Sequence, residues 1–321
     1  MNAKTTAKIN EKKSISSTLT LLIALVVLWI AFSLLTPYFF GARNINNLLK
    51  YSSVMGIAAS GVLIVIISGG LDLSIGSTVA LTGMMSALAM SKVDIWYVGV
   101  LAGLATALVC GVINAGLITV VKINPFITGL GTMTIFRGLC FLVNRALSIS
   151  ITNNAYKFIG QGTIGGFPLI ILIMALMFVI VGFVLKYTKF GRHVYSVGGN
   201  AQASYLAGIN IKKARFKIYL LSALMAGIAG ICQSSLTGTA SPSAASELVM
   251  VCISSVILGG ASLAGGKGNI FGTIIGVILL GTISNGLTLL NLSQYYQDIT
   301  RGIILLLAVS LDTIKGKGAY N

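Results

Sequence analysis

Side chains that perform acid–base, nucleophilic or metal chemistry are rare in this sequence of 321 residues. The six carboxylates are scattered along the chain as Glu11, Asp72, Asp94, Glu247, Asp298 and Asp312. The single histidine, His193, cannot supply the two ligands of an HExxH zinc site, and the GxSxG motif of hydrolases does not occur. We therefore expect that the protein is not an enzyme and that it binds no metal.

Neither the cysteines nor the glycine-rich segment 261–268 has the spacing of a metal site or of a phosphate-binding loop. All four cysteines lie in apolar runs without CxxC spacing, so we interpret them as small buried residues: Cys110, Cys140, Cys232 and Cys252. The nearest approach to a phosphate-binding loop is ASLAGGKG at 261–268. It lacks both the first glycine of GxxxxGK[ST] and the hydroxyl that holds Mg²⁺. The chain itself is therefore predicted to bind no cofactor.

The composition indicates an integral membrane protein. Hydrophobic residues make up 56% of the chain, charged residues only 9%, and the mean hydropathy is +0.96. A soluble domain carries roughly 25% charged residues. The net charge of +16 would also suit a nucleic-acid-binding protein. Because cytoplasmic loops of membrane proteins are rich in Lys and Arg, we favour membrane topology as its cause and expect no nucleic-acid partner.

Apolar segments recur along the chain at lengths close to the roughly 20 residues that a transmembrane helix needs. The fold class predicted from them is all-α: a polytopic membrane protein with about ten transmembrane helices. The segments are 17–38, 52–69, 75–91, 96–120, 126–143, 167–186, 216–236, 247–264, 270–290 and 297–314.

The basic residues predict the orientation of these helices. With the N-terminus inside, fifteen Lys and Arg fall in inner loops and five in outer loops. This bias predicts that both termini are cytoplasmic. The domains are then a cytoplasmic tail 1–16, one transmembrane domain 17–315 with a cytoplasmic loop 187–215, and a tail 316–321. A signal peptide cleaved near the small-x-small triplet Ala31-Phe32-Ser33 is the alternative for the first span; the apolar run continues past that point, which favours an uncleaved helix.

Two pairs of similar segments suggest an internal repeat. ISGGLDLS at 67–74 resembles ILGGASLA at 257–264, and GVINAGL at 111–117 resembles GTISNGL at 281–287. The members of the pairs are 190 and 170 residues apart, so the first half holds about one extra span, which would make the repeats inverted, as in many transporters. Chance similarity among Gly, Ile and Leu is the alternative.

The longest polar stretch between apolar segments is Lys186–Lys217, which contains seven Lys or Arg and no carboxylate. Within it, Asn200 suits the N-cap of a helix, residues 201–207 would form about two turns, and Gly208 suits a left-handed residue after the helix. Such a short helix could dock into a groove of a partner protein through Tyr205 and Leu206. Alternatively, the flanking Lys and Arg could hold it on a surface of anionic lipid.

The scarcity of carboxylates also bears on the source of energy. Ion-coupled carriers commonly need carboxylates or broken helices within the membrane. Here only Asp298 is a plausible carboxylate inside a span, and Arg301 lies one turn further on the same helix face. We interpret this pair as a neutralised packing contact. Energy is therefore expected from another subunit, and an ion-coupled secondary carrier is the less favoured alternative.

Several motifs resemble a known family. The segment GRHVYSVGGNAQASYLAGI at 191–209 resembles the cytoplasmic-loop motif of ABC-importer permeases of the ribose, galactose, xylose and autoinducer-2 class. SGGLDLSIGS at 68–77, LGGASLAGGKGNIFGT at 258–273 and the C-terminal stretch LLGTISNGLTLLNLSQYYQDITRGIILLLAV are also similar to that family. The resemblance covers nearly the whole chain.

The resemblance implies a permease subunit in the bacterial inner membrane, surrounded by lipid, that imports a monosaccharide. The implied partners are a second permease chain, identical or different, a periplasmic sugar-binding protein, and cytoplasmic ATPase subunits that hold ATP and Mg²⁺. A pentose such as ribose, a hexose or a furanosyl signal such as autoinducer-2 would each fit. ABC permeases for nucleosides or branched-chain amino acids remain the nearest alternative.

The resemblance assigns a coupling element, and the chemistry and positions of other residues suggest candidates that the resemblance does not carry over. It implies that residues 200–208 form the coupling helix seated on the ATPase, with contacts from Asn200, Ala201, Ala203, Tyr205, Leu206, Ala207 and Gly208. A sugar needs hydrogen-bonding side chains and aromatic faces, so Asn114, Asn285, Phe126 and Tyr296 are candidates for the substrate path, with plain helix packing as the alternative. Asp72 and Lys267, at predicted cytoplasmic ends of spans, are candidates for a gate or a second ATPase contact; solvated loop charges are the alternative.

Overall fold

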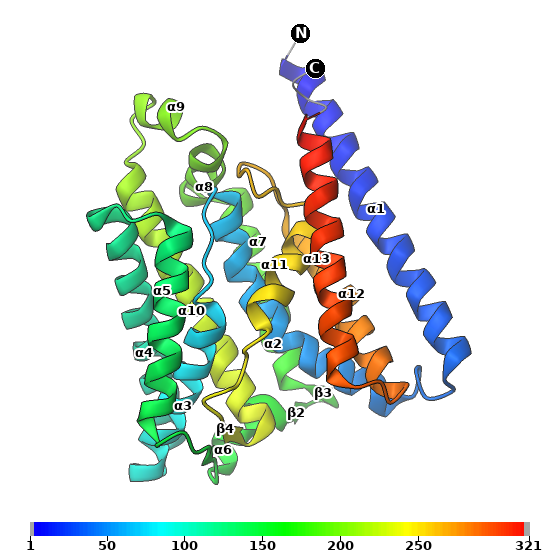
Figure 1. Ribbon diagram of the computed structural model, residues 1–321, viewed down its shortest axis with the longest axis vertical. Helices are drawn as coiled ribbons and strands as arrows, with labels where there is room; N and C mark the ends of the chain where they lie inside the picture. The colour runs from blue at the N-terminus through cyan, green and yellow to red at the C-terminus, as the bar shows by residue number, and fades with distance from the viewer. Residues whose placement is uncertain (1–2, 318–321) are drawn as a thin grey trace.

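A computed structural model describes the backbone of residues 3–317 and the side chains of residues 18–307, 309 and 310. It is a bundle of helices with a few two-residue strands (Figure 1). The long helices are α1 (Ala3–Leu35), α2 (Ala42–Ile67), α3 (Ile75–Val93), α4 (Trp96–Gly116), α5 (Pro125–Val143), α7 (Leu169–Tyr187), α10 (Ile211–Thr237), α12 (Ile270–Leu289) and α13 (Gln294–Lys317).

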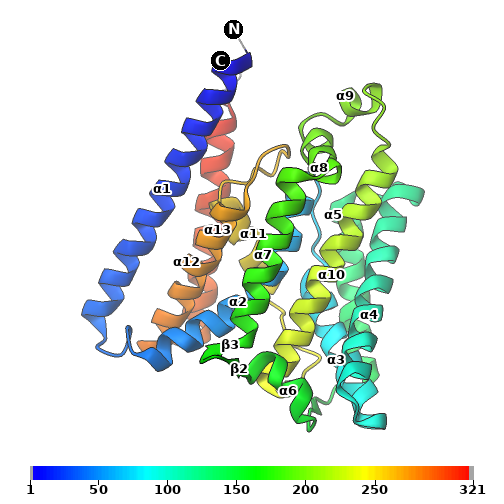
Figure 2. The ribbon, with the colours of Figure 1, turned by 180° about the vertical axis from the view of Figure 1, so that it is seen from behind.

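The shorter elements lie at the ends of the bundle or inside it. They are a π turn η1 (Leu117–Val121), the helices α6 (Asn154–Gln161), α8 (Lys189–Gly199), α9 (Ala201–Leu206) and α11 (Leu248–Leu258), and the strands β1 (Ile149–Ser150), β2 (Thr163–Ile164), β3 (Phe167–Pro168) and β4 (Thr239–Ala240). Strands β1 and β4 pair antiparallel, as do β2 and β3. The strands and α6 lie at the end opposite α8 and α9 (Figures 1 and 2).

Helix α2 is the centre of the bundle. Its sequence from Gly56 to Ile67 is apolar or small at every position, and all of these residues are buried. A helix that is hydrophobic on every side is stable only when other helices surround it. Gly56 lies against Met174 of α7, and Gly61 lies against Ser222 of α10. These small residues let the neighbouring helices approach the axis of α2 closely.

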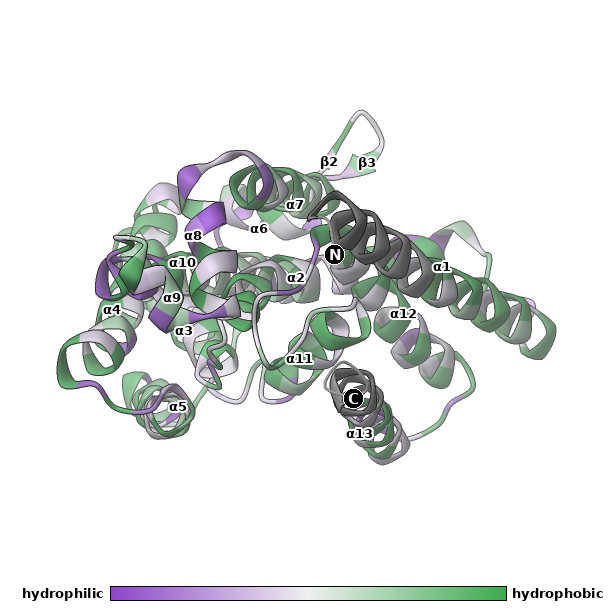
Figure 3. Ribbon diagram, turned by 90° about the horizontal axis from the view of Figure 1, so that it is seen from above, coloured by the Kyte–Doolittle hydropathy of each residue, from purple (hydrophilic) through white to green (hydrophobic). Residues whose placement is uncertain are grey.

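Helix α1, by contrast, is attached at the edge (Figure 1). Only 11% of its most apolar window, Thr18–Leu35, is buried. Its main partner is α12: the Trp29 indole N–H donates to the Thr282 hydroxyl at 3.1 Å, and Phe32 covers Gly286. The long helices are largely hydrophobic, and hydrophilic residues gather around α8 when the bundle is seen from that end (Figure 3).

Seven of the ten predicted spans correspond to helices of membrane-spanning length. Among the described residues, seven helices are long and apolar enough to cross a membrane: α1, α2, α4 with η1, α5, α7, α10 and α12. The other three predicted segments correspond to α3, α11 and α13. Helix α11 has 11 residues, which gives a length of about 16 Å against a hydrocarbon core of about 30 Å. The polytopic, mostly helical architecture is confirmed, and the count of ten stays a prediction.

The predicted internal repeat can be compared with the directions of the helices that carry the paired segments. Helix α3 is the extra element between the first members of the two segment pairs. Helices α2 and α11 run in the same direction, whereas α4 and α12 run in opposite directions (Figure 1), so one symmetry operation does not relate both pairs.

The predicted tails 1–16 and 316–321 lie partly outside the described residues; α1 reaches back to Ala3 and α13 extends to Lys317.

Close packing of α11 against α12 yields a test. Gly272 and Gly276 share one face of α12, and a Cβ at Gly276 would overlap the Ser255 carbonyl oxygen of α11. Gly276→Ala is therefore expected to lower the free energy of unfolding by about 1–3 kcal/mol. Gly131→Ala is the matched control, because the space around Gly131 in α5 is open. Thermal unfolding in detergent measures both variants, and equal melting temperatures would contradict this packing.

Candidate functional site

Three consecutive helix caps shape the segment after α7. The Thr188 hydroxyl accepts from the Gly191 N–H at 3.1 Å and starts α8. The Asn200 side-chain oxygen accepts from the Ala203 N–H at 2.8 Å and starts α9, and that of Asn210 accepts from the Lys213 N–H at 2.9 Å and starts α10. Each cap satisfies a backbone donor that the first turn of a helix leaves without a partner. The predicted cap at Asn200 is confirmed.

The end of α9 is also as predicted. Gly208 has φ = +82°, a left-handed conformation that glycine adopts without steric cost. The Gly208 N–H donates to the Tyr205 carbonyl at 2.9 Å, and the Ile209 N–H donates to the Ser204 carbonyl at 3.0 Å. Helix α9 itself ends at Leu206, and Ala207 is its C-cap. The segment is therefore a short helix held in one conformation at both ends.

One face of α9 is fastened to α8 and the other is free. Ser204 is 2% exposed, and its hydroxyl forms a 2.7 Å hydrogen bond with the Ser196 hydroxyl of α8. Tyr205 and Leu206 are 65% and 77% exposed, and Gln202 and Ala203 are also exposed. Helix α9 thus presents a small uncharged surface that projects from one end of the bundle (Figure 1).

Near its C-terminal end, helix α8 meets the end of α2 and the segment before α12 at four glycines, Gly69, Gly198, Gly265 and Gly266, which we call the glycine junction. A Cβ at Gly198 would overlap the Ile67 carbonyl oxygen at the end of α2 and lie 2.7 Å from the Gly266 nitrogen. One at Gly265 would lie 2.6 Å from the Gly198 carbonyl oxygen and 2.9 Å from the Gly69 Cα. The junction is therefore a contact of backbone on backbone.

Two hydrogen bonds fix the glycine junction. The Gly266 N–H donates to the Ile67 carbonyl at 2.7 Å, which ties the segment before α12 to the end of α2. The Tyr195 hydroxyl of α8 donates to the Gly268 carbonyl at 2.8 Å, and burial raises the pKa of Tyr195, so it remains a neutral donor. Helix α8 is thereby connected to both α2 and α12, while α9 extends from its C-terminal end.

The loop 68–74, which follows α2, is folded into the protein. Asp72 is 5% exposed, and one of its oxygens accepts from the Ser74 N–H at 2.9 Å and from the Ser74 hydroxyl at 2.6 Å. The Asn114 side-chain amide donates to the same Ser74 hydroxyl at 2.8 Å. Burial raises the pKa of Asp72, and the two bonds from Ser74 lower it in part. The alternative interpretation of Asp72 as a solvated loop charge is therefore wrong. Lys267, in contrast, is exposed and forms no ion pair within the described residues.

The four predicted substrate-path residues lie in separate places. Asn114 belongs to the Asp72 loop contact, and its side-chain oxygen is buried without a protein partner. Asn285 of α12 exchanges two amide hydrogen bonds with Asn44 of α2, at 2.9 and 2.8 Å. Phe126 on α5 and Tyr296 on α13 are 49% and 58% exposed. The contacts of the described residues join no two of these four, and their role in a path stays a prediction.

The predicted contact between Asp298 and Arg301 is confirmed at 3.1 Å. Arg301 also pairs with a second carboxylate, Glu247, which precedes α11 and which the sequence did not predict. The other terminal nitrogen of Arg301 donates to the Ser284 hydroxyl of α12 at 3.1 Å. This cluster ties α11, α12 and α13 together. Its only sequence signal was an otherwise unexplained carboxylate at the start of an apolar segment.

The sequence matches, over residues 44–309, the family described as branched-chain amino acid transport system / permease component. The chain belongs to this permease family. It is a transport component and not an enzyme, and the resemblance to import permeases seen in its motifs is confirmed. No solved structure matches the chain.

Several curated relatives are similar over almost the whole chain. It is 39% identical over 296 residues to the ribose import permease protein RbsC of Bacillus subtilis, an alignment that covers 91% of this chain and 92% of that one. The L-arabinose transport system permease protein AraH of Escherichia coli is 35% identical, with coverage of 92% and 90%. The xylose transport system permease protein XylH of Haemophilus influenzae is 30% identical, with coverage of 92% and 96%.

The glycine junction can be tested with neighbouring residues. Gly198→Ala adds a methyl group where backbone already lies, and is expected to separate α8 from α2 at a cost of about 1–3 kcal/mol. Gly199→Ala is the matched control, since no atom lies within 4 Å of a Cβ there. Melting temperature and hydrogen–deuterium exchange of α8 should change in the first variant only. Equal exchange in both would contradict the contact.

Asp72 yields a prediction with a pH dependence. Asp72→Ala leaves the buried N–H and hydroxyl of Ser74 without an acceptor and is expected to cost about 1–3 kcal/mol, whereas Asp72→Asn keeps the acceptor oxygen. Because burial raises the pKa of Asp72 in the folded protein, the wild type should lose stability relative to Asp72→Asn as the pH rises through that raised value. Melting temperatures across a pH series measure both effects; a pH-independent difference between wild type and D72N would contradict the assignment.

Proposed function

We propose that this chain is the transmembrane permease subunit of an ATP-driven ABC importer that carries a monosaccharide across the bacterial inner membrane. The observation that carries this proposal is the extent of the similarity. Relatives named for ribose, L-arabinose and xylose each align over 91–92% of this chain. Such full-length similarity includes α9 and the glycine junction, which are the parts suited to meet another subunit.

In this proposal the chain acts with three kinds of partner. Cytoplasmic ATPase subunits hold ATP and Mg²⁺, a periplasmic protein delivers the sugar, and a second permease chain, identical or different, completes the path. The family description as one component of a transport system supports a need for such partners. The scarcity of carboxylates in the chain supports an energy source in another subunit.

The proposal also includes an orientation. The end that carries α8, α9, the start of α1 and the end of α13 faces the cytoplasm (Figure 1). The basic residues support it, because the segments 186–192 and 212–217 at this end hold seven Lys or Arg. The opposite end, with α6 and the two strand pairs, then faces the periplasm and the sugar-binding protein.

Helix α9 is the proposed contact with the ATPase. Its exposed side chains are Gln202, Ala203, Tyr205 and Leu206, without a single Lys or Arg, which favours a groove in a protein over a surface of anionic lipid. Because Ser196 and Ser204 fasten α9 to α8, a displacement of α9 would move α8. Through the glycine junction it would then move the end of α2 and the segment before α12. Rigid coupling of this kind can open the path to one side at a time.

Reconstitution tests the function and the contact together. With the cognate ATPase and binding protein in proteoliposomes, we expect ATP-dependent uptake of at least one of ribose, arabinose and xylose. Leu206→Asp puts a charge on the exposed surface of α9 and should reduce uptake tenfold or more and weaken co-purification of the ATPase. Phe167→Asp, at the opposite end and 68% exposed, is the control and should keep the ATPase bound.

Other results would replace the proposal. Uptake of leucine without any sugar would assign the activity printed in the family description. Sugar uptake that needs a proton gradient and no ATP would indicate an ion-coupled carrier. Normal ATPase binding by Leu206→Asp would exclude α9 as the coupling element.

A further inference from the structure

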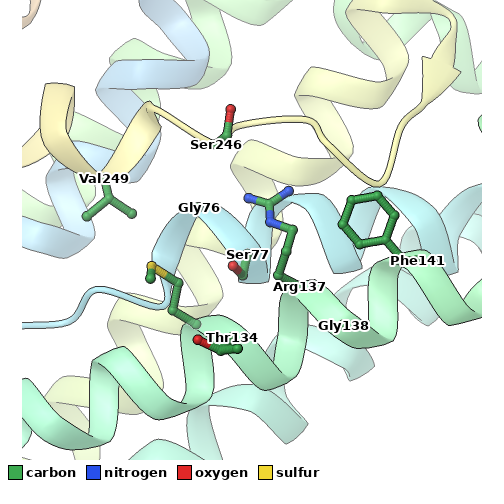
Figure 4. Close-up of a pocket in the computed structure, with 9 residues that line it drawn as sticks. Gly76, Ser77, Thr134, Arg137, Gly138, Phe141, Ser246 and Val249 are labelled. Carbon is green, nitrogen blue, oxygen red and sulfur yellow. The ribbon is translucent and has the colours of Figure 1, made fainter. Parts of the chain in front are cut away.

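A cavity of about 470 Å³ lies between α3, α5 and the residues at the start of α11. Helix α5 contributes Thr134, Arg137 and Phe141, α3 contributes Ser77, and Ser246 lies just before α11. Figure 4 shows the Arg137 side chain extending from α5 towards Ser246, with Ser77 beside it. The volume is in the usual range for small-molecule sites, about 300–1,000 Å³.

The cavity lies about half way along the bundle and is open at its surface, where Thr134, Phe141 and Ser246 are exposed. Helix α11 ends next to the segment that forms the glycine junction, and its 11 residues extend about 16 Å. Its first residue, Leu248, is therefore about half way through a hydrocarbon core of about 30 Å. Figure 1 shows α11 at mid-height in the bundle. Transport proteins commonly hold their substrate at this depth, beside helices that begin or end inside the membrane.

The polar groups of the cavity have unused hydrogen-bonding capacity. One terminal nitrogen of Arg137 donates to the carbonyls of Pro242 and Ala244, at 2.7 and 2.8 Å. No carboxylate pairs with Arg137 among the described residues, and its other N–H groups remain for a ligand. The Ser77 hydroxyl is buried, 1% exposed, and has no partner in the protein. A buried polar group of this kind is costly unless a ligand or water satisfies it.

This set of groups matches an uncharged polyol. Arg137 supplies donors, Ser77 and Ser246 supply hydroxyls that both donate and accept, and Phe141 supplies an apolar face for the C–H groups of a sugar ring. An amino acid would fit less well. Its carboxylate could pair with Arg137, but no carboxylate lines the cavity to receive its ammonium group, and Glu247 is already paired with Arg301.

Two walls of the cavity, α3 and the start of α11, are connected along the chain to the glycine junction. Ser77 follows the loop 68–74, whose Gly69 lies against Gly198 and Gly265. Helix α11 leads into the segment that contains Gly265 and Gly266. A movement of α8 would therefore reach two walls of the cavity, whereas α5 does not take part in the junction. A site with this connection can change its affinity when the ATPase moves α9.

We propose that this cavity is a contact site for the transported monosaccharide, in which Arg137 and Ser77 hydrogen-bond the sugar hydroxyls and Phe141 packs against the ring. The assignment rests on the proposed import function and names the part of the path that the sugar touches half way across the membrane. It differs from the four residues expected from the sequence, which lie elsewhere.

The test uses the complete reconstituted importer and labelled ribose, arabinose or xylose, whichever the wild type accumulates. Ser77→Ala removes a hydroxyl that bonds nothing in the protein, so the fold should remain. Loss of one hydrogen bond to the sugar is expected to raise the KM of uptake about three- to tenfold, and Phe141→Ala should raise it as well. Ser222→Ala in α10 removes another buried hydroxyl without a partner, outside the cavity, and should keep the wild-type KM.

The ATPase rate stimulated by the binding protein is measured beside uptake. A raised KM with unchanged stimulation supports the site. A wild-type KM in both Ser77→Ala and Phe141→Ala overturns it while the import function stands. A wild type that accumulates none of the three sugars overturns the proposed function itself, which makes the two failures distinguishable.

Discussion

Direct contact of backbone with backbone at the glycine junction is the constraint on which the end of the bundle that carries α8 and α9 depends. Gly198 leaves no space between α8 and the last turn of α2, and the Gly266 N–H satisfies the Ile67 carbonyl there. A side chain at Gly198 or Gly265 would separate these elements. Because Gly265 and Gly266 have φ of +85° and +72°, the segment can turn sharply and still bring a donor to the end of α2. Because no flexible side chains separate the backbones there, a displacement of α8 would displace the end of α2 and the segment before α12 as well.

Polar contacts between elements organise the remainder of the bundle. The Asp72–Ser74–Asn114 chain keeps the loop 68–74 inside the protein, and Arg301 joins the helices near the start of α13 through Glu247 and Ser284. In an apolar bundle such groups specify which helices are neighbours, because a wrong pairing leaves them without partners. They therefore provide the specificity that van der Waals packing of apolar side chains supplies only weakly.

Local signals in the sequence were sufficient for features that depend on neighbouring residues. The membrane class, seven of the long helices, the cap at Asn200 and the left-handed Gly208 follow from composition and capping preferences. Features that depend on tertiary contact were missed. The sequence predicts a polar loop where α8 lies. Val194 and Val197, three residues apart and both buried, are a weak indication of a helix with one buried face. The pairing of Asn285 with Asn44, 241 residues earlier, and the cavity around Arg137 leave no trace in local sequence.

The position of α1 at the edge of the bundle has a consequence for biogenesis. Helix α1 leaves the ribosome well before α12, because its hydrogen-bonding partner there is 253 residues further along the chain. At a synthesis rate of about 5–20 residues per second, α1 waits tens of seconds for that partner. It must therefore persist alone in lipid, and an apolar window with a mean hydropathy of 2.6 and little burial suits that interval. The family match begins at residue 44, beyond α1, so a helix that must wait for its partner lies outside the part of the chain that defines the family.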